Sequence, residues 1–300
     1  MTTRPRFLCI GDIDVDILIE VDHLPTRDGK VNGQHLRRVP GGMAGNASVA
    51  LSRLGACVRI LGRVGDDDEG AFALDALAQA GVETGFVSHL AGVRTFSCIG
   101  LITPDGEKSL IKLMTAAYRP AAEELTVQTV EGVAHIHLTS AGDPVLCRRV
   151  VDVARAHGAT TSLDVEEADC PSERSALEAA ITGFDLLFCN TEARAVLDVR
   201  LANRLTGLVA TIITTRGECG ARVETGGHSI DAEGFAADVL DTTGAGDCFA
   251  AACLHARIVQ HLDWREALRF ANRAASLSTQ GYGAQAALPT WTEVAAALAG

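Results

Sequence analysis

Short apolar runs that end in glycine alternate with helical stretches along most of this chain. The first run covers 6–11, and it is followed by a helix over 44–54, a strand over 58–61 and a helix over 69–80. Runs that are apolar throughout suit strands buried on both faces. The alternation therefore predicts an α/β fold, a mostly parallel sheet with helices on both faces. Further strands are predicted at 133–138, 159–164, 185–189 and 209–214, and further helices at 245–258 and 265–280.

Two regions depart from this alternation and predict a small β-sheet beside the core. Residues 93–103 and 107–114 flank the turn signal Pro104-Asp-Gly106, which is typical of a hairpin. Residues 31–39 are also short and strand-like, and 220–235 predict one more hairpin. We expect one domain over 1–300 with a lid whose strands come from about 12–39 and 93–115.

The composition excludes some classes of function. The chain has 26 basic and 38 acidic residues, a formal charge of −12, so it lacks the basic footprint of a nucleic-acid-binding protein. No apolar stretch approaches the roughly 18 residues of a membrane span, and the N-terminal apolar run is too short for a signal peptide. We expect a cytoplasmic protein that contacts neither nucleic acid nor membrane.

A glycine-rich turn stands directly before the predicted helix 245–258. It reads Asp241-Thr-Thr-Gly-Ala-Gly-Asp247. Such a turn presents backbone N–H groups and the positive end of the helix dipole, which favours an anion. Asp247 places a carboxylate beside those amides, as phosphoryl transfer to a hydroxyl requires. A simple helix cap is the alternative for this pattern.

Two further clusters have polar side chains suited to a ligand. Acids at period two, Asp12, Asp14 and Asp16, point to one face of an extended segment. Three carboxylates on one face repel one another unless they bind a cation or sugar hydroxyls, and a solvated edge is the alternative. Gly42 and Asn46 open the helix 44–54, and Asn46 offers both a donor and acceptors.

Together these motifs resemble those of the PfkB/ribokinase family of carbohydrate kinases. The resemblance rests on Gly-Gly-x-x-x-Asn ending at Asn46, on Gly65-Asp66, and on Asp241–Asp247. It implies a ribokinase-like doubly wound α/β core with a small β-sheet lid. It also implies ATP as phosphate donor, Mg²⁺, and a hydroxyl of a sugar or sugar-like molecule as acceptor.

The resemblance also implies roles for individual residues. Asp247 resembles the catalytic base, with an anion hole from the amides of Gly244, Ala245 and Gly246. Other positions match the substrate contacts (Asp14, Asp16, Gly42, Asn46), the nucleotide site (Asn190, Thr215, Gly217, Gly220, and Asn272 with the loop 281–285), a water-mediated magnesium contact (Glu192) and a possible K⁺ site (Asp241 and Thr243 with that loop).

Some positions depart from the family pattern. One residue, Thr191, separates Asn190 from Glu192, where the family has two. Met43 stands where ribokinases have lysine, the segment after Asp164 lacks an arginine, and an acid near Ser140 is missing. These departures leave the substrate open, and a nucleoside kinase for an adenosine- or pseudouridine-type substrate is the alternative to a sugar kinase.

Two other classes fit the sequence less well. A nicotinamide dehydrogenase needs its glycine fingerprint after the first strand, where Gly11-Asp-Ile-Asp14 stands instead. A binding protein without catalysis would not need Asp247. His135 and His137 alternate on an apolar strand without a third ligand nearby, which favours structural histidines over a metal pair. We also expect that exposed strands of the lid pair two copies of the chain in a homodimer.

Overall fold

The computed structural model describes residues 5–104 and 108–299, and its core is an eight-stranded sheet. The strands are β1 (Arg6–Ile10), β4 (Cys57–Leu61), β9 (Val133–Leu138), β10 (Thr160–Val165), β11 (Leu186–Asn190), β12 (Thr211–Thr215), β13 (Ala221–Thr225) and β14 (His228–Ala232). Their order is β14-β13-β12-β11-β10-β9-β1-β4. The neighbours from β12 to β4 are parallel, and the hairpin β13–β14 extends the sheet antiparallel.

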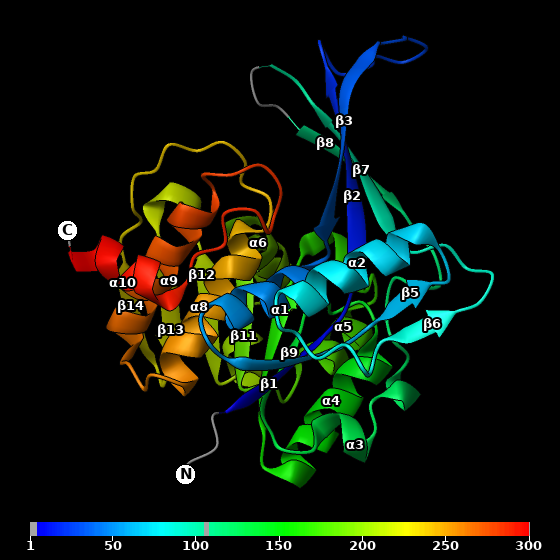
Figure 1. The fold of residues 1–300 in the computed structure, drawn as a ribbon. Coiled ribbons are helices and arrows are strands. Elements are labelled where there is room, and N and C mark those ends of the chain that lie inside the picture. Colours follow the sequence, from blue (N-terminus) through cyan, green and yellow to red (C-terminus); the bar gives the residue numbers. More distant parts are fainter. Residues whose placement is uncertain (1–4, 105–107, 300) are drawn as a thin grey trace.

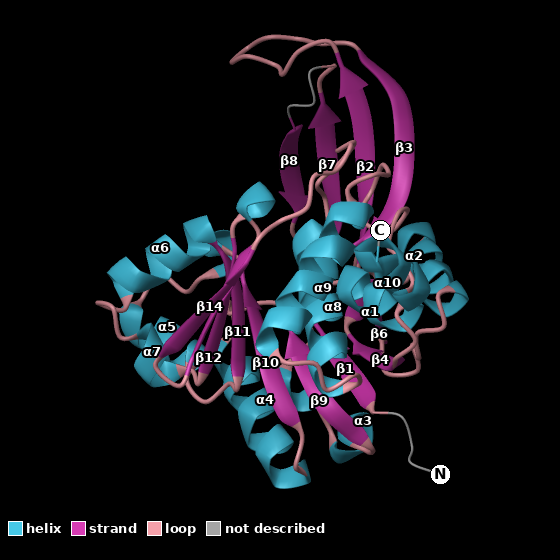
Figure 2. Cartoon of the chain, turned by 90° about the vertical axis from the view of Figure 1, so that its left-hand side faces the viewer, coloured by secondary structure: helices cyan, strands magenta, loops and turns pink. Residues whose placement is uncertain are grey.

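Helices cover both faces of this sheet (Figure 2). Along β1 the side chains alternate: Phe7 and Cys9 belong to one apolar core, and Leu8 and Ile10 to the other. This alternation explains why the strand is apolar throughout. The first face carries α1 (Met43–Arg53), α2 (Asp68–Gln79), α8 (Ala245–Ile258), α9 (Trp264–Ser278) and α10 (Trp291–Ala299), and the second carries α3 (Val127–Val130), α4 (Pro144–His157), α5 (Arg174–Ile181), α6 (Thr191–Arg200) and α7 (Leu205–Leu208).

A second sheet of four strands, which we call the small sheet, projects from one end of the core (Figure 1). It consists of β2 (Asp14–Val21), β3 (Gly33–Gly41), β7 (Ser97–Ile102) and β8 (Lys108–Leu113), in the order β3-β2-β7-β8. The pairs β2–β3 and β7–β8 are antiparallel, and the parallel pair β2–β7 joins them. Of the predicted turn Pro104-Asp-Gly106, Asp105 and Gly106 lie outside the described residues.

The predicted fold class is confirmed, with the strands and helices of the core ending within about two residues of those expected, whereas the strand predicted at 93–103 begins only at Ser97. Asp67 caps α2 by accepting a hydrogen bond from the amide of Gly70 at 3.0 Å. A two-stranded sheet, β5 (Arg63–Gly65) with β6 (Ser88–Leu90), was not predicted. No helix within 5–104 or 108–299 is long and apolar enough to cross a membrane.

The two histidines of β9 are buried between strands and bonded to hydroxyls of β10. His135 contacts Thr160 through Nδ1 (2.7 Å) and Ser162 through Nε2 (2.8 Å), and His137 contacts Ser162 through Nδ1 (2.7 Å). Burial lowers the pKa of His135 to about 3 and that of His137 to about 4. Both rings are therefore neutral parts of the core, as the structural interpretation predicted.

We expect acid to destabilise the protein through His137. An unfolded histidine binds a proton below about pH 6.5, whereas His137 stays neutral in the folded state until about pH 4. Stability is therefore lost as the pH falls through this window. Between pH 7.5 and pH 5 the wild type should lose about 2 kcal/mol more unfolding free energy than His137→Gln, measured by urea denaturation. The control variant His89→Gln, at an exposed position, should lose as much unfolding free energy between pH 7.5 and pH 5 as the wild type. An equal loss in His137→Gln would contradict the assignment of this effect to His137.

Candidate active site

The glycine turn predicted to bind an anion lies at the start of α8. Gly244 caps the helix with φ 74°, a left-handed conformation, and a Cβ there would lie 2.6 Å from the Cβ of Ala284. Only glycine fits this position. The amide of Ala245 donates to the carbonyl oxygen of Thr242 at 3.2 Å. The amide of Ala245 could therefore bind an anion, as predicted, only if it gave up this hydrogen bond to Thr242.

Asp247 lies in the first turn of α8, with its side chain nearly buried at 8% exposure. Its Oδ2 accepts a hydrogen bond of 2.8 Å from Nδ2 of Asn46 on α1. The Oδ1 of Asn46 in turn accepts one of 3.0 Å from Nε2 of Gln285. Burial raises the pKa of Asp247 well above its ordinary value, and the bond from Asn46 lowers it. The structure thus joins two motifs that are 201 residues apart in the sequence.

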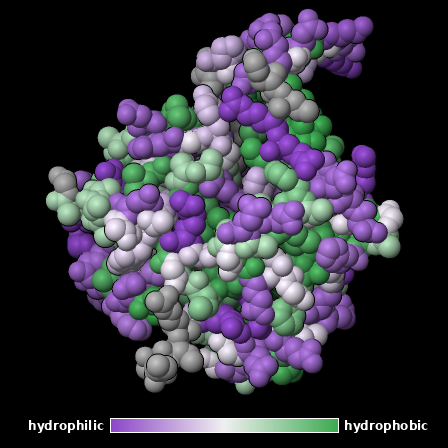
Figure 3. Space-filling model, in the orientation of Figure 1, coloured by the Kyte–Doolittle hydropathy of each residue, from purple (hydrophilic) through white to green (hydrophobic). Residues whose placement is uncertain are grey.

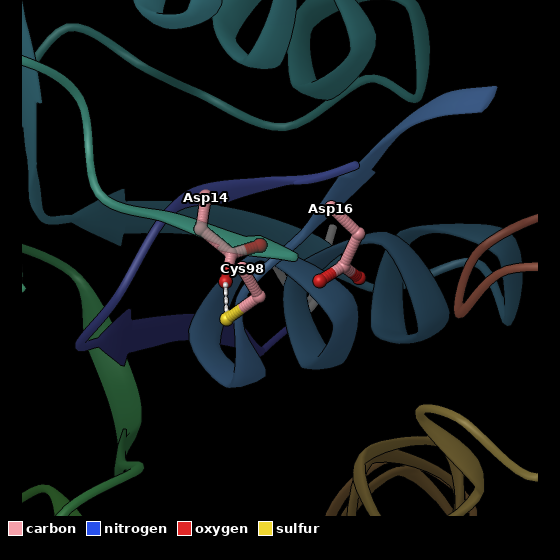
Figure 4. A group of neighbouring side chains, drawn as sticks. All are labelled: Asp14, Asp16 and Cys98. Atoms are coloured by element: carbon pink, nitrogen blue, oxygen red, sulfur yellow. Dashed lines mark hydrogen bonds between the residues drawn. The ribbon is translucent and has the colours of Figure 1, made fainter. Parts of the chain in front are cut away.

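The three acids of the first cluster lie together, near the amino end of β2. Asp12 accepts hydrogen bonds from the amide of Met43 (3.2 Å) and from the hydroxyl of Thr139 (3.3 Å). Asp14 accepts one of 3.5 Å from the thiol of Cys98, and Asp16 lies beside this pair (Figure 4). All three acids are buried, so the alternative of a solvated edge is wrong.

Two glycines next to these acids allow a close approach that a side chain would prevent. A Cβ on Gly41 would lie 2.2 Å from Oδ1 of Asp14 and 2.8 Å from Oδ2 of Asp16. Gly42 has φ 85°, and a Cβ there would lie 2.5 Å from the carbonyl oxygen of Asp12. The predicted substrate residues Asp14, Asp16, Gly42 and Asn46 are thus grouped around the start of α1 and β2.

A cavity of about 150 Å³ opens at the carboxyl ends of β10, β11 and β12, where ligands bind in folds of this kind. Asp247 and Asp164 contribute carboxylates to its wall. Burial raises the pKa of Asp164 to about 7, with a further contribution from the charge of Glu166. The residues that line this first cavity include Met43, Asp164, Glu166, Asn190, Thr215, Gly244, Gly246, Asp247 and Phe249.

A second cavity, of about 460 Å³, adjoins the first, because Thr215, Gly246 and Phe249 line both. The predicted nucleotide residues Thr215, Gly217, Gly220 and Asn272 all line it. Asn272 has a structural role as well, since its Nδ2 donates to the carbonyl oxygens of Ala232 (3.1 Å) and Glu233 (2.9 Å). Most of the remaining wall is apolar and includes Phe235, Ala236, Ala237, Val239 and Ala275.

Some predicted residues lie elsewhere than the resemblance implied. Within the described chain, residues 281–285 do not line the second cavity, because the bond from Gln285 to Asn46 and the packing of Ala284 on Gly244 hold this loop toward α1. Asn190 lines the first cavity as predicted, but its Oδ1 also caps α6 through the amide of Ala193 at 2.7 Å. Glu192 is exposed in the first turn of α6 and lines neither cavity.

The predicted K⁺ residues make contacts with one another and with the 281–285 loop. Asp241 accepts hydrogen bonds from the amide (2.9 Å) and the hydroxyl (2.5 Å) of Thr243 through Oδ1, and from the amide of Gly283 (2.9 Å) through Oδ2. The carboxylate of Asp241 therefore holds the first residues of the glycine turn against this loop.

Sequence reasoning did not assign several residues of the first cavity, among them Asp164, Glu166 and Phe249. Asp164 had a usable signal, because it stands at the carboxyl end of a predicted parallel strand, where ligands bind. Phe249 follows Asp247 by two residues in an apolar helix, and nothing in the sequence separates it from the core residues around it.

The fold and the two adjoining cavities define the class of this protein, and comparison with known proteins gives the family. A model described as "pfkB family carbohydrate kinase" matches residues 4–291. The chain therefore belongs to the pfkB family of carbohydrate kinases, and the predicted resemblance is confirmed.

Individual relatives agree with this family. The chain is 30% identical over 294 residues to a ribokinase of Bacillus subtilis, covering 96% of this chain and 98% of the relative. It is 31% identical over 298 residues to an ATP-dependent ribose-1-phosphate kinase of Halopiger xanaduensis, covering 98% of each. An Arabidopsis thaliana ribokinase solved with ribose and ATP superposes over 99% of both chains, with a TM-score of 0.84 at 24% identity. A nucleoside kinase of Methanocaldococcus jannaschii superposes over 98% of both, with a TM-score of 0.86 at 24% identity.

Proposed function

We propose that this carbohydrate kinase transfers the γ-phosphate of ATP to a hydroxyl of a sugar or sugar-like molecule, with Asp247 as general base. One observation carries the proposal. Asp247 lines the first cavity beside the glycine turn, and Gly246 of that turn lines both cavities. A donor in the second cavity and an acceptor near Asp247 would therefore meet at the glycine turn.

The surroundings of Asp247 suit a general base. Its burial raises the pKa well above the ordinary value of an aspartate, which makes the carboxylate a stronger base. The bond from Asn46 to Oδ2 holds the carboxylate in one orientation. Asp247 would accept the proton of the acceptor hydroxyl as the hydroxyl oxygen bonds to the γ-phosphorus and the bond from that phosphorus to the bridging oxygen breaks, which releases ADP. The amides at the start of α8 would bind the phosphate oxygens.

The residues present fit ATP and Mg²⁺. The second cavity is within the usual size range of small-molecule sites, and its mostly apolar wall suits an adenine ring. Asp164 and Glu166 bring oxygen ligands, which Mg²⁺ prefers, to the first cavity. When bound, Mg²⁺ would neutralise phosphate oxygens. The water-mediated role of Glu192 and a K⁺ site at Asp241 and Thr243 are retained as proposals.

The small sheet is proposed to act as a lid over the acceptor. Its residues Asp14, Asp16 and Gly41 lie at the base of β2 and β3, next to the start of α1. Arg37 of β3 lies over the ring of Tyr282, 4.9 Å from its centre, so the small sheet also contacts the 281–285 loop. A sheet in this position would exclude water from the transferred phosphate. We propose that it is part of a single domain over 1–300.

The edge of the small sheet supports the proposed homodimer. Strand β8 is an edge strand that exposes Leu110 (53%) and Ile111 (50%), and Met114 just beyond it is 58% exposed. Figure 3 shows apolar side chains on the small sheet below a hydrophilic tip. Exposed apolar edge strands are normally covered by another chain or segment.

A second candidate is a nucleoside kinase of the same fold. Met43 lines the first cavity where a sugar site would gain from a polar side chain. An apolar residue there favours an acceptor that carries a base, of the adenosine or pseudouridine type.

A coupled assay of ADP release tests the proposal and separates these candidates. The protein would be given ATP and Mg²⁺ with pentoses, hexoses, amino sugars, sugar acids and nucleosides, with and without K⁺. We expect ADP release that depends on one acceptor class. Saturable ATP binding without ADP release for any acceptor would contradict the proposed function.

A further inference from the structure

The two edges of the small sheet contact the core through charged side chains. At one edge, Arg38 of β3 lies 3.8 Å from Glu69 of α2. At the other edge, Nζ of Lys112 on β8 lies 3.3 Å from Oε2 of Glu166 and 4.0 Å from Oδ1 of Asp169. The apolar side chains of β8 are largely exposed, so this edge gains little from packing on the core. We call the contact of Lys112 with Glu166 and Asp169 the latch.

The core side of the latch is held in place by hydrogen bonds to Asp169, whose side chain is only 9% exposed. Its Oδ2 accepts hydrogen bonds from the hydroxyls of Tyr118 (2.5 Å) and Ser140 (3.3 Å), and its Oδ1 lies 3.4 Å from Nη2 of Arg119. Tyr118 in turn packs on Phe96, just before β7, with ring centres 4.5 Å apart. Ion pairs contribute more in such a fixed network than as isolated pairs at the surface.

The other acid of the latch, Glu166, stands directly after β10 and lines the first cavity. Burial raises the pKa of Asp164 and of Asp247 in this cavity, and the negative charge of Glu166 raises both further. Within the described chain, neither the first nor the second cavity is lined by a lysine or an arginine. Lys112 is therefore the cation that balances Glu166 and orients its carboxylate.

We propose that Lys112 holds the free edge of the small sheet to the core and positions Glu166 at the wall of the first cavity. This inference rests on the proposed function, in which the small sheet is the lid, and it assigns the residue that keeps the lid in place. Lys112 is a positioning residue, because it acts through Glu166 and Asp169. The contact uses Oε2 of Glu166, so Oε1 can still bind a ligand in the cavity.

Loss of the latch would affect the reaction in two ways. A small sheet that is loose at β8 admits water to the transferred phosphate. The water oxygen would then bond to the γ-phosphorus and give its proton to Asp247, while the bond to the bridging oxygen breaks and releases ADP and inorganic phosphate. The loose sheet would also bind the acceptor less firmly. ATP binding should be unaffected, because none of the described residues that line the second cavity belongs to the small sheet.

The variant Lys112→Met tests the kinetic role of the latch, because methionine keeps an unbranched apolar stem and loses the charge. We expect the KM for the best acceptor to rise about three- to tenfold and ATP hydrolysis without acceptor to rise at least about threefold. The kcat with acceptor and the Kd for ATP should stay within about twofold of the wild type. Lys112→Arg keeps the charge and should restore most of the acceptor affinity. Assays of ADP release and calorimetric titration of ATP measure these quantities.

Amide hydrogen exchange tests the latch without catalysis. In the protein without ligands, the amides of β8 should exchange at least about threefold faster in Lys112→Met than in the wild type. Asp169→Asn keeps the shape of the other partner and removes its charge. The double variant should raise KM by less than the product of the two single effects, because the two changes remove one shared contact.

Controls make each outcome decisive. Lys30→Met removes an exposed lysine from the loop between β2 and β3 and should match the wild type in every measurement. With Tm showing that Lys112→Met is folded, an unchanged KM or unchanged exchange in β8 overturns the inference while the kinase proposal stands. Fully multiplicative effects in the double variant, or a loss that falls on kcat, also overturn it. No ADP release with any acceptor overturns the proposed function, and the exchange of β8 then decides the latch by itself.

Discussion

Asp247→Asn should lower kcat at least about a hundredfold while ATP still binds. General-base catalysis typically contributes about 10²–10⁴-fold, and asparagine cannot accept the hydroxyl proton. The replacement has the same shape, and its carbonyl oxygen can still accept the hydrogen bond from Asn46. The loss should therefore appear in kcat, with little change in the Kd for ATP. Steady-state kinetics with the best acceptor, together with calorimetric titration of ATP, measure the two quantities.

The thermal stability of this variant provides the control. Removing a buried carboxyl whose pKa is raised by burial takes away a group that is costly to ionise, so Tm should not fall. A folded variant that turns over at a near-normal rate would show that Asp247 is not the base. A variant that loses ATP binding as well would point to a structural role for this carboxylate.

Gly41→Ala should abolish most acceptor binding without affecting the nucleotide. The added Cβ would lie 2.2 Å from Oδ1 of Asp14 and 2.8 Å from Oδ2 of Asp16, so both carboxylates must move. Displacement of positioning groups by about 1 Å can cost about 10²-fold in rate. We expect kcat/KM for the acceptor to fall about a hundredfold, mainly through KM, while the Kd for ATP is unchanged.

Gly45→Ala is a matched control for this prediction. Gly45 is four residues further along, in α1, and its Cβ would meet only Nε2 of Gln285 at 3.8 Å, an ordinary contact. Alanine also favours a helix over glycine by about 1 kcal/mol, so the variant should be as stable as the wild type or more so. Equal kinetic losses in both variants, or none in Gly41→Ala, would remove Asp14 and Asp16 from the acceptor site.

The sequence predicted the core sheet well, because its strands are apolar on both faces and its helices end at glycines. The side chains from Phe7 to Ile10 alternate between two apolar cores. Every position of such a strand is buried, so the strand is apolar throughout. The glycine turn at α8 was predicted for a similar reason. Its residues are fixed by backbone conformation, since Gly244 adopts a left-handed φ that other residues avoid.

The contacts between motifs could not be predicted from the residues alone. The hydrogen bond from Asn46 to Asp247 depends on how α1 packs on α8, which no local pattern encodes. The same applies to the parallel pair β2–β7, which joins two strand pairs that the sequence predicted separately. Asn190 shows that one residue type can serve two purposes, because it caps α6 and also lines the first cavity, and the sequence pattern alone does not separate these roles.

The two cavities meet at Gly246, where a Cβ would find no neighbouring atom within 4 Å. Gly246 therefore places no side chain at the wall that the two cavities share. A bisubstrate inhibitor, in which a sugar acceptor is tethered to adenosine through a chain of phosphates, would therefore reach into both cavities at once. Its affinity would gain from the tether, because the second half binds at the high effective concentration set by the first.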